Sequence, residues 1–187
     1  NNIQPGGTVH DASPEGNHGT NNGATVVRGG GKVGNAFEFS GDTAFVDIPD
    51  DSSFSPDANE ITIAAWINAD ETQTGRASGI VTKDDLGQNR DWNLHLSSAS
   101  SPNPWALRCR IIPLAGPDTV DGVTDLRDNT WHHVVGRWNG SELSVWVDGE
   151  KENSMTTSGT LGDTNANVRI GNFADAGTNF VYNMEGL

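Results

Sequence analysis

Two adjacent histidines, His132 and His133, stand among tryptophans in the segment TWHHVVGRWNG and are the first candidates for chemistry. Imidazole nitrogens ligate metals and transfer protons, so the pair could belong to a metal site or a catalytic site. The residues around them alternate in polarity, which predicts a strand whose successive side chains point to opposite faces. The two imidazoles therefore cannot share one metal, and we interpret both as hydrogen-bonded residues of a packed sheet.

Oxygen-bearing side chains in the segment HDASPEGNHG form a second set of candidates. Calcium takes carboxylate, amide and carbonyl oxygens as ligands. Asp11 and Asn17 supply such atoms here, and Asp42 in SGDTAF is a further candidate ligand. Asp and Asn are also typical of turns, because their side chains bond to the nearby backbone. The sequence thus leaves two interpretations open, a structural calcium ion and simple turn formation.

The elements that must position these residues are short strands. Helical periodicity is nearly absent, whereas alternating or β-branched runs recur between Gly, Asn, Asp and Pro residues. This pattern predicts an all-β fold, an antiparallel β-sandwich of the jelly-roll type. The runs are ATVVR, AFEFS, AFVDI, ITIAAWIN, SGIVTK, DWNLHLS, WALRCRII, HHVVGRW, LSVWVDG and NVRIG.

The clearest turn is NGS at residues 139–141, between two alternating runs. Asn-Gly in this position is the strongest short signal for a β-hairpin. Alternation places His133, Val135 and Arg137 on one face of the first strand and His132, Val134, Gly136 and Trp138 on the other. We interpret the tryptophans of the hairpin as packing residues, and Trp66 in ITIAAWIN as a core residue.

Length and charge limit the function. The chain has 187 residues, which suits one domain spanning 1–187. Its 25 acidic and 11 basic residues give a net charge of −14, and its lysines are only Lys32, Lys83 and Lys151, so a nucleic-acid partner is not expected. The single cysteine, Cys109, lies in a predicted strand and is interpreted as a core residue. No apolar run is long enough to cross a membrane, so no membrane insertion is expected.

The segment TWHHVVGRWNGSELSVWVDGE resembles a strand pair of the concanavalin A-like lectin/glucanase superfamily, in its laminin G-like branch. Other segments resemble the same family in the same order: VHDASPEGNHGTNNGA, GKVGNAFEFSGDTAFVDIPDDSSFS, ITIAAWINAD, IVTKDD and VRIGNFADAGTNFVYNMEGL. The resemblance covers nearly the whole chain and implies a jelly-roll sandwich. It also implies a structural calcium near Asp11 in some relatives, often completed by an acid from the last strand.

The two ends depart from the family pattern. NNIQPGG stands where the family has a short apolar-aromatic strand, and MEGL stands where the last strand begins. We therefore expect a single laminin G-like domain that lacks the first and last family strands. A sheet edge left unpaired in this way would invite association.

No motif predicts catalysis. Glycosidases of this superfamily carry carboxylates on alternate positions of one strand, in a pattern such as Glu-x-Asp-x-x-Glu, and no such run occurs here. The acidic pairs in PDDS and KDDL lie at predicted turns. No Gly-x-Ser-x-Gly elbow, phosphate loop or zinc spacing is present either. A hydrolase or lyase is therefore the least favoured hypothesis.

The resemblance makes carbohydrate the expected ligand, and its candidate contacts are aromatic, Asp, Asn and Arg side chains near loops. These candidates are Arg90, Trp92, Asn103, Trp105, Arg108, Arg110, Asp175 and Tyr182. Arg108 and Arg110 alternate with Leu107 and Cys109, so they should project from one face together. In the alternative interpretation, Trp92 is a core residue and the arginines pair with the many acids.

We therefore expect a non-catalytic carbohydrate-binding module, with a polysaccharide or glycan as partner. We expect it to be extracellular, in a secreted or cell-surface protein that carries further domains. The alternative from another class is a protein–protein adhesion or spacer module without affinity for glycans. Fold alone does not choose between these, because lectin-like sandwiches change ligands through their outer residues.

Overall fold

The computed structural model describes residues 4–40, 43–55, 59–71, 77–84, 90–112, 118–172 and 182–185, with the main chain alone at 90 and 182–185. Within these ranges the protein is an antiparallel β-sandwich, as predicted. Its described helical element is a 3-10 turn, η1 (Ser52–Phe54), and no helix in the described ranges could cross a membrane.

One layer is an eight-stranded sheet with the strand order β1-β2-β5-β14-β7-β8-β9-β10. Every neighbouring pair in this sheet is antiparallel. Its strands are β1 (Thr8–Val9), β2 (Gly19–Asn22), β5 (Phe45–Ile48), β7 (Ser78–Asp84), β8 (Arg90–Leu96), β9 (Leu107–Ile111), β10 (Asp118–Asp121) and β14 (Val168–Ile170).

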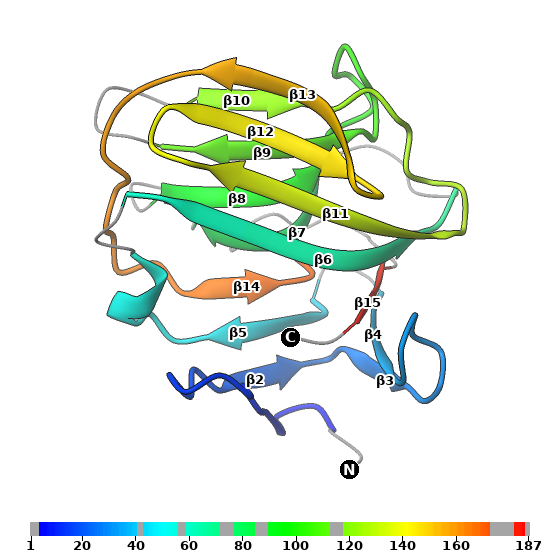
Figure 1. Cartoon of the computed structure of the whole chain (residues 1–187). Coiled ribbons are helices and arrows are strands. Elements are labelled where there is room, and N and C mark those ends of the chain that lie inside the picture. Colours follow the sequence, from blue (N-terminus) through cyan, green and yellow to red (C-terminus); the bar gives the residue numbers. More distant parts are fainter. Residues whose placement is uncertain are drawn as a thin grey trace.

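The other layer is a seven-stranded antiparallel sheet with the order β13-β12-β11-β6-β15-β4-β3. Its strands are β3 (Thr25–Val27), β4 (Ala36–Phe39), β6 (Ile61–Ala69), β11 (Trp131–Trp138), β12 (Glu142–Val147), β13 (Glu150–Thr156) and β15 (Tyr182–Glu185). In Figure 1 the strands β6, β11, β12 and β13 lie in front of β7, β8, β9 and β10.

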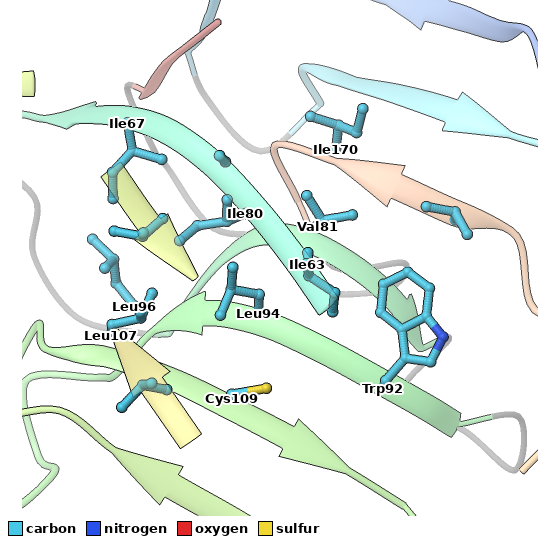
Figure 2. Close-up of a cluster of buried hydrophobic side chains, with 14 of the residues drawn as sticks. Ile63, Ile67, Ile80, Val81, Trp92, Leu94, Leu96, Leu107, Cys109 and Ile170 are labelled. Atoms are coloured by element: carbon cyan, nitrogen blue, oxygen red, sulfur yellow. The ribbon is translucent and has the colours of Figure 1, made fainter. Parts of the chain in front are cut away.

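The core lies between the two sheets and is made largely of alternate residues from the central strands (Figure 2). Leu94 and Cys109 come from the eight-stranded sheet, and Ile63 and Ile67 from the other. The two sheets approach closely at Gly136, where an added Cβ would lie 2.7 Å from the Cys109 sulfur and 2.8 Å from a Leu94 methyl carbon. This contact explains a glycine in the middle of β11.

Several sequence predictions are confirmed by these elements. Each predicted alternating run contains a strand, and the NGS turn at 139–141 joins β11 to β12 with Trp138 opposite Leu143. Cys109 is a core residue with 2% exposure, and burial raises the pKa of its thiol to about 12. Such a thiol stays protonated and inert at neutral pH.

The tryptophans of the seven-stranded sheet are placed differently from the prediction. Trp138 alone of the hairpin tryptophans is buried in the core, at 1% exposure. Trp131 and Trp146 are half-buried and lie on the outer face of the sheet, as does Trp66. The prediction was wrong for these residues because alternation divides a strand into two faces without saying which face meets the core.

The two histidines also lie outside the core. His132 is held at the end of β11, where its Nδ1 lies 2.7 Å from Asp148 Oδ2 and its Nε2 lies 3.2 Å from Asp128 Oδ1. His133 faces the opposite way, with its ring 5.2 Å from the Trp66 ring. The two imidazoles do diverge, as the alternation predicts, but each is half-buried at the surface.

A fully buried lysine joins distant segments of the sandwich. Lys83 Nζ lies 2.8 Å from Asp91 Oδ2 and 2.9 Å from Asp50 Oδ1, and it donates to the Thr164 carbonyl. Burial lowers the pKa of Lys83, but its hydrogen bonds to Asp91 and Asp50 outweigh that effect and raise the pKa. The ammonium is therefore charged, and Asp91 balances it at 0% side-chain exposure.

We predict that Asp91→Ala lowers the free energy of unfolding by about 3 kcal/mol, because it leaves a buried ammonium with less compensation. Urea unfolding monitored by circular dichroism measures this change. Asp163→Ala, at an exposed carboxylate, is the matched control and should stay within about 0.5 kcal/mol of the wild type. A loss below about 1 kcal/mol for Asp91→Ala would contradict the prediction.

Candidate functional site

Polar side chains form one continuous row across the outer face of the eight-stranded sheet. In an antiparallel sheet, residues directly opposite each other share a face. The cross-strand register connects Thr8, Thr20, Asp47, Arg169, Thr82, Asn93, Arg110 and Thr119, in that order. We call these eight residues the polar row. They offer hydrogen-bonding groups at strand intervals of about 4.8 Å.

The side chains of the polar row point away from the core, because the residues that alternate with them along each strand point into the core. In β9 the core residues Leu107, Cys109 and Ile111 alternate with Arg108 and Arg110. The prediction that these two arginines project from one face is therefore confirmed.

The middle of the polar row is nonetheless buried. Thr82 and Asn93 are each 1% exposed, and Asp84 beside them is also 1% exposed. Asn93 Nδ2 donates to Asp84 Oδ2 at 2.8 Å, whereas Asn93 Oδ1 is buried and accepts no hydrogen bond in the described part of the chain. A buried acceptor without a donor is costly, so Asn93 Oδ1 is a natural point for a ligand hydroxyl or a water to bond.

A second outward row runs beside the first and adds further titratable groups to the face. His95 lies opposite Arg108, which lies opposite Asp121. The Arg108 guanidinium donates to both oxygens of Asp121, with Nε–Oδ1 2.5 Å and Nη2–Oδ2 2.6 Å. This bonding, more than any other influence, raises the pKa of Arg108. Arg108 is thereby fixed as a positioned cation at the edge of the face.

His95 is a neutral imidazole in this setting. It is 4% exposed, and burial, followed by the charges of Arg108 and Arg110, lowers its pKa to about 3. A neutral imidazole has one donor and one acceptor nitrogen. The face therefore combines an amide, an imidazole and guanidinium groups, which together suit a ligand rich in hydroxyl groups.

The two tryptophans predicted as sugar contacts are buried instead. Trp92 is 4% exposed in the core, and its Nε1 donates to the Phe54 carbonyl. Trp105 is 2% exposed and is covered by the Arg127 guanidinium, 4.5 Å from its ring. The prediction that they offer exposed faces was wrong, and the core interpretation of Trp92 holds. Trp92 is the third residue of β8 and Trp105 lies just before β9, where the sequence pattern does not separate loop from core.

The other predicted sugar contacts either lie apart from the polar row or fall outside the described residues. Asn103 lies in the loop before β9, where its Nδ2 donates to the Gly122 carbonyl at 2.8 Å. Arg90 begins β8, and Tyr182 begins β15 in the opposite sheet. Asp175 and Asp42 lie outside the described residues, so their roles stay predictions.

The predicted calcium ligands are engaged in turn formation. Asp11 accepts hydrogen bonds from the Ser13 and Asn17 backbone nitrogens, both at 2.8 Å, and from Ser13 Oγ. The bonds from Ser13, followed by that from Asn17, lower the pKa of Asp11. The Asn17 amide donates to Ser53 Oγ. No group of three or more His, Cys, Asp or Glu residues within the described ranges could hold a metal ion. These residues match the turn interpretation, and calcium at this loop stays a prediction.

The residues Asn93, His95, Thr82 and Asp84 were not among the predicted contacts. A signal was present, because DWNLHLS alternates polar and apolar residues and so assigns Asn93 and His95 to one face. Asn93 and His95 lie beside Arg110 and Thr82 only because β8 pairs with β9 and β7. Alternation within one strand does not predict which strands pair.

Comparison with known proteins identifies the family. A family model for the concanavalin A-like lectin/glucanases superfamily matches residues 40–184. The chain belongs to this superfamily. The predicted relationship and its sandwich fold are thus confirmed, and the polar row lies on one outer face of that fold. No curated protein matches this sequence.

Similar solved structures of this superfamily fold include toxin binding domains. The binding domain of Paraclostridial Mosquitocidal Protein 1 has a TM-score of 0.73 at 14% identity, over 94% of this chain and 44% of that one. A botulinum neurotoxin type C structure, described with two ganglioside molecules needed for cell entry, has a TM-score of 0.69 at 15% identity, over 98% and 45%. The chain thus spans less than half of these domains, and the likeness is one of fold.

A third similar structure comes from a polysaccharide-degrading protein. It is Domain 4 of AbnA, an extracellular arabinanase from Geobacillus stearothermophilus, in complex with arabinotriose. The TM-score is 0.56 at 16% identity, over 86% of this chain and 72% of that one. As with the toxin structures, the likeness at this level of identity is one of fold.

We predict that His95 makes the protein less stable below neutral pH. Because its folded-state pKa of about 3 lies below the ordinary 6.5, its neutral form contributes full stability above pH 6.5 and loses it as the pH falls. The unfolding free energy should fall by up to about 1.4 kcal/mol per pH unit between pH 6 and pH 4.5. Urea unfolding of the wild type and His95→Gln should show a flatter profile for the variant.

His132 contributes to the pH dependence of stability with the opposite sign. Burial lowers its pKa, but hydrogen bonds to Asp148 and Asp128 outweigh this and raise it, so its stabilisation is present at low pH and lost as the pH rises. The control variant is His10→Gln, at an exposed imidazole. Both His95→Gln and this control retain His132, so its contribution is the same in all three proteins. Equal slopes for the wild type and His95→Gln would contradict the prediction.

Proposed function

We propose that this chain is a non-catalytic carbohydrate-binding module and that the polar row is its binding face. The observation that carries the proposal is Asn93 Oδ1, a buried acceptor in the middle of the polar row with no donor among the described residues. Sugar hydroxyls donate and accept hydrogen bonds, so they can satisfy such an acceptor while they accept bonds from Arg110. The row crosses eight strands, which suits an extended glycan chain better than a single sugar unit.

The neighbouring structures support a binding role. One was solved with arabinotriose, and another is described through its interaction with gangliosides, so the same sandwich holds sugars in other proteins. Those ligands belong to those proteins, and specificity in this fold changes with outer residues. We therefore propose glycan as the ligand class and leave the particular sugar to experiment.

Two carboxylates of this face have partners that make them poor catalysts. Hydrolysis of a glycosidic bond uses a pair of carboxyl groups, one protonated as an acid and one ionised. Asp84 accepts a hydrogen bond from Asn93, and Asp121 is held by both donors of the Arg108 fork. With both oxygens bonded to the Arg108 guanidinium, Asp121 is not placed to donate a proton to a glycosidic oxygen. These bonds support binding without cleavage.

The wider setting follows from the same proposal. A module that holds a glycan is useful as part of a larger extracellular, secreted or cell-surface protein, as in the arabinanase that contains Domain 4. The net charge of −14 suits a soluble surface. Calcium remains part of the proposal only as a structural ion at the loop of Asp11 and Asn17.

We predict that the wild-type domain is retained on at least one glycan class in a panel of insoluble and gel-embedded polysaccharides that includes arabinan. Arg110→Gln and Asn93→Ala should each weaken retention about tenfold or more, because each removes a buried or charged hydrogen bond worth about 1.5–3 kcal/mol. The measurement is affinity electrophoresis, repeated with calcium and with chelator. Loss of retention with chelator would support the structural ion.

Arg28→Gln, at an exposed arginine next to β3, is the matched control and should leave retention unchanged. Circular dichroism confirms that each variant is folded. A folded wild-type domain that no glycan retains would overturn the carbohydrate role and favour a protein-binding or spacer module. Release of reducing ends or unsaturated products would overturn the non-catalytic role.

A further inference from the structure

The outer face of the seven-stranded sheet, opposite the polar row, carries a set of tryptophans. Trp66 lies opposite His133, Trp131 lies opposite Asn68, and Trp146 lies opposite Val135. Because these pairs belong to neighbouring strands β6, β11 and β12, their side chains form one continuous outward surface. We call Trp66, Trp131, Trp146, His133 and Val135 the tryptophan face. It belongs to the front layer in Figure 1.

These residues are half-buried, and their strand neighbours fill the core instead. Ala65, Val134 and Val145 alternate with them and are 9%, 0% and 0% exposed. The tryptophan face is therefore not needed to complete the interior of the sandwich. Large aromatic side chains gathered on an outer sheet face commonly mark a binding surface, and flat rings stack on the apolar faces of sugar rings.

Both accessible lysines of the protein stand over this face. Lys32 Nζ lies 5.0 Å from the Trp66 ring centroid, and Lys151 Nζ lies 5.6 Å from the Trp146 ring centroid. Lys151 is also the direct cross-strand neighbour of Trp146. The third lysine, Lys83, is fully buried. In a chain with a net charge of −14, this placement concentrates scarce positive charge beside aromatic rings.

The two lysines differ in how firmly they are held. Lys151 Nζ also pairs with Glu142 Oε1 at 3.1 Å, at 38% side-chain exposure on both partners. An exposed ion pair of this kind is worth little and exchanges readily for another anion. Arg137, exposed and opposite Thr62 and Ser144, adds a further cation to the same face. An anionic ligand would therefore meet cations along the edge of the rings.

We propose that the tryptophan face is a second binding site and that its ligand is an anionic polysaccharide, with uronate or sulfate groups. The sugar rings stack on Trp146 and Trp66, and their acidic groups pair with the ammoniums of Lys151 and Lys32. This site does not depend on the polar row, because the two lie on opposite faces of the sandwich. A module with both sites bridges two glycan chains.

The test measures binding of the purified domain to polygalacturonate, to a sulfated carrageenan and to neutral amylose by calorimetry at low salt. The wild type should bind at least one anionic polymer more tightly than amylose, and added salt should weaken that binding. The double variant Lys32→Gln/Lys151→Gln changes only exposed residues and should weaken the binding about tenfold or more. Trp146→Ala should weaken it similarly. The two anionic polymers distinguish carboxylate from sulfate as the recognised group.

Arg28→Gln, which removes a positive charge at an exposed arginine outside both named faces, is the control and should leave binding of the anionic polymer unchanged. Arg110→Gln, on the opposite sheet, tests whether the polar row contributes to this binding. The proposal is overturned if neither anionic polymer binds, if the double lysine variant binds as the wild type does, or if Arg110→Gln abolishes the binding. If the polar row proves not to bind glycan, Arg110→Gln will have no effect on any polymer, whereas the lysine variants will still report on the tryptophan face.

Discussion

Alternation along antiparallel strands in fixed register is the constraint on which the rest of this structure depends. Each strand divides its side chains between the core and one outer face, so β9 sends Cys109 inward and Arg110 outward. Because residues directly opposite each other share a face, the register keeps the inward and outward sets aligned from one strand to the next. A shift of one residue in any strand would exchange core and surface and break the polar row.

The two outer faces that result have different chemistry. One face presents hydroxyl, amide, imidazole and guanidinium groups, and in its middle Asn93 and His95 are buried at 1% and 4% exposure. The other presents half-buried rings with ammonium groups above Trp66 and Trp146. Since the core is shared, each face can vary in sequence without changing the packing of the other. Such independence lets one sandwich carry more than one ligand site.

Buried polar groups fix the relative positions of segments more specifically than apolar contacts alone would. Lys83 joins Asp50, Asp91 and the Thr164 carbonyl, which belong to segments far apart in the chain. Because each group would be costly to bury without its partners, this arrangement admits few alternatives. It fixes β7 and β8, the two strands that carry Thr82 and Asn93, relative to the loop that precedes β14.

The sequence by itself determined the fold class, the superfamily, the hairpin at residues 139–141 and the shared face of Arg108 and Arg110, because these depend on local patterns. Strands such as β13, which is mostly polar, gave no apolar alternation and were not predicted. Only the tertiary structure decided that Trp105 is buried while Trp66 and Trp146 are outward. It also brought Asp47, Arg169 and Asn93 into one row, because the pairing of strands distant in sequence is settled by the packing of the whole sandwich.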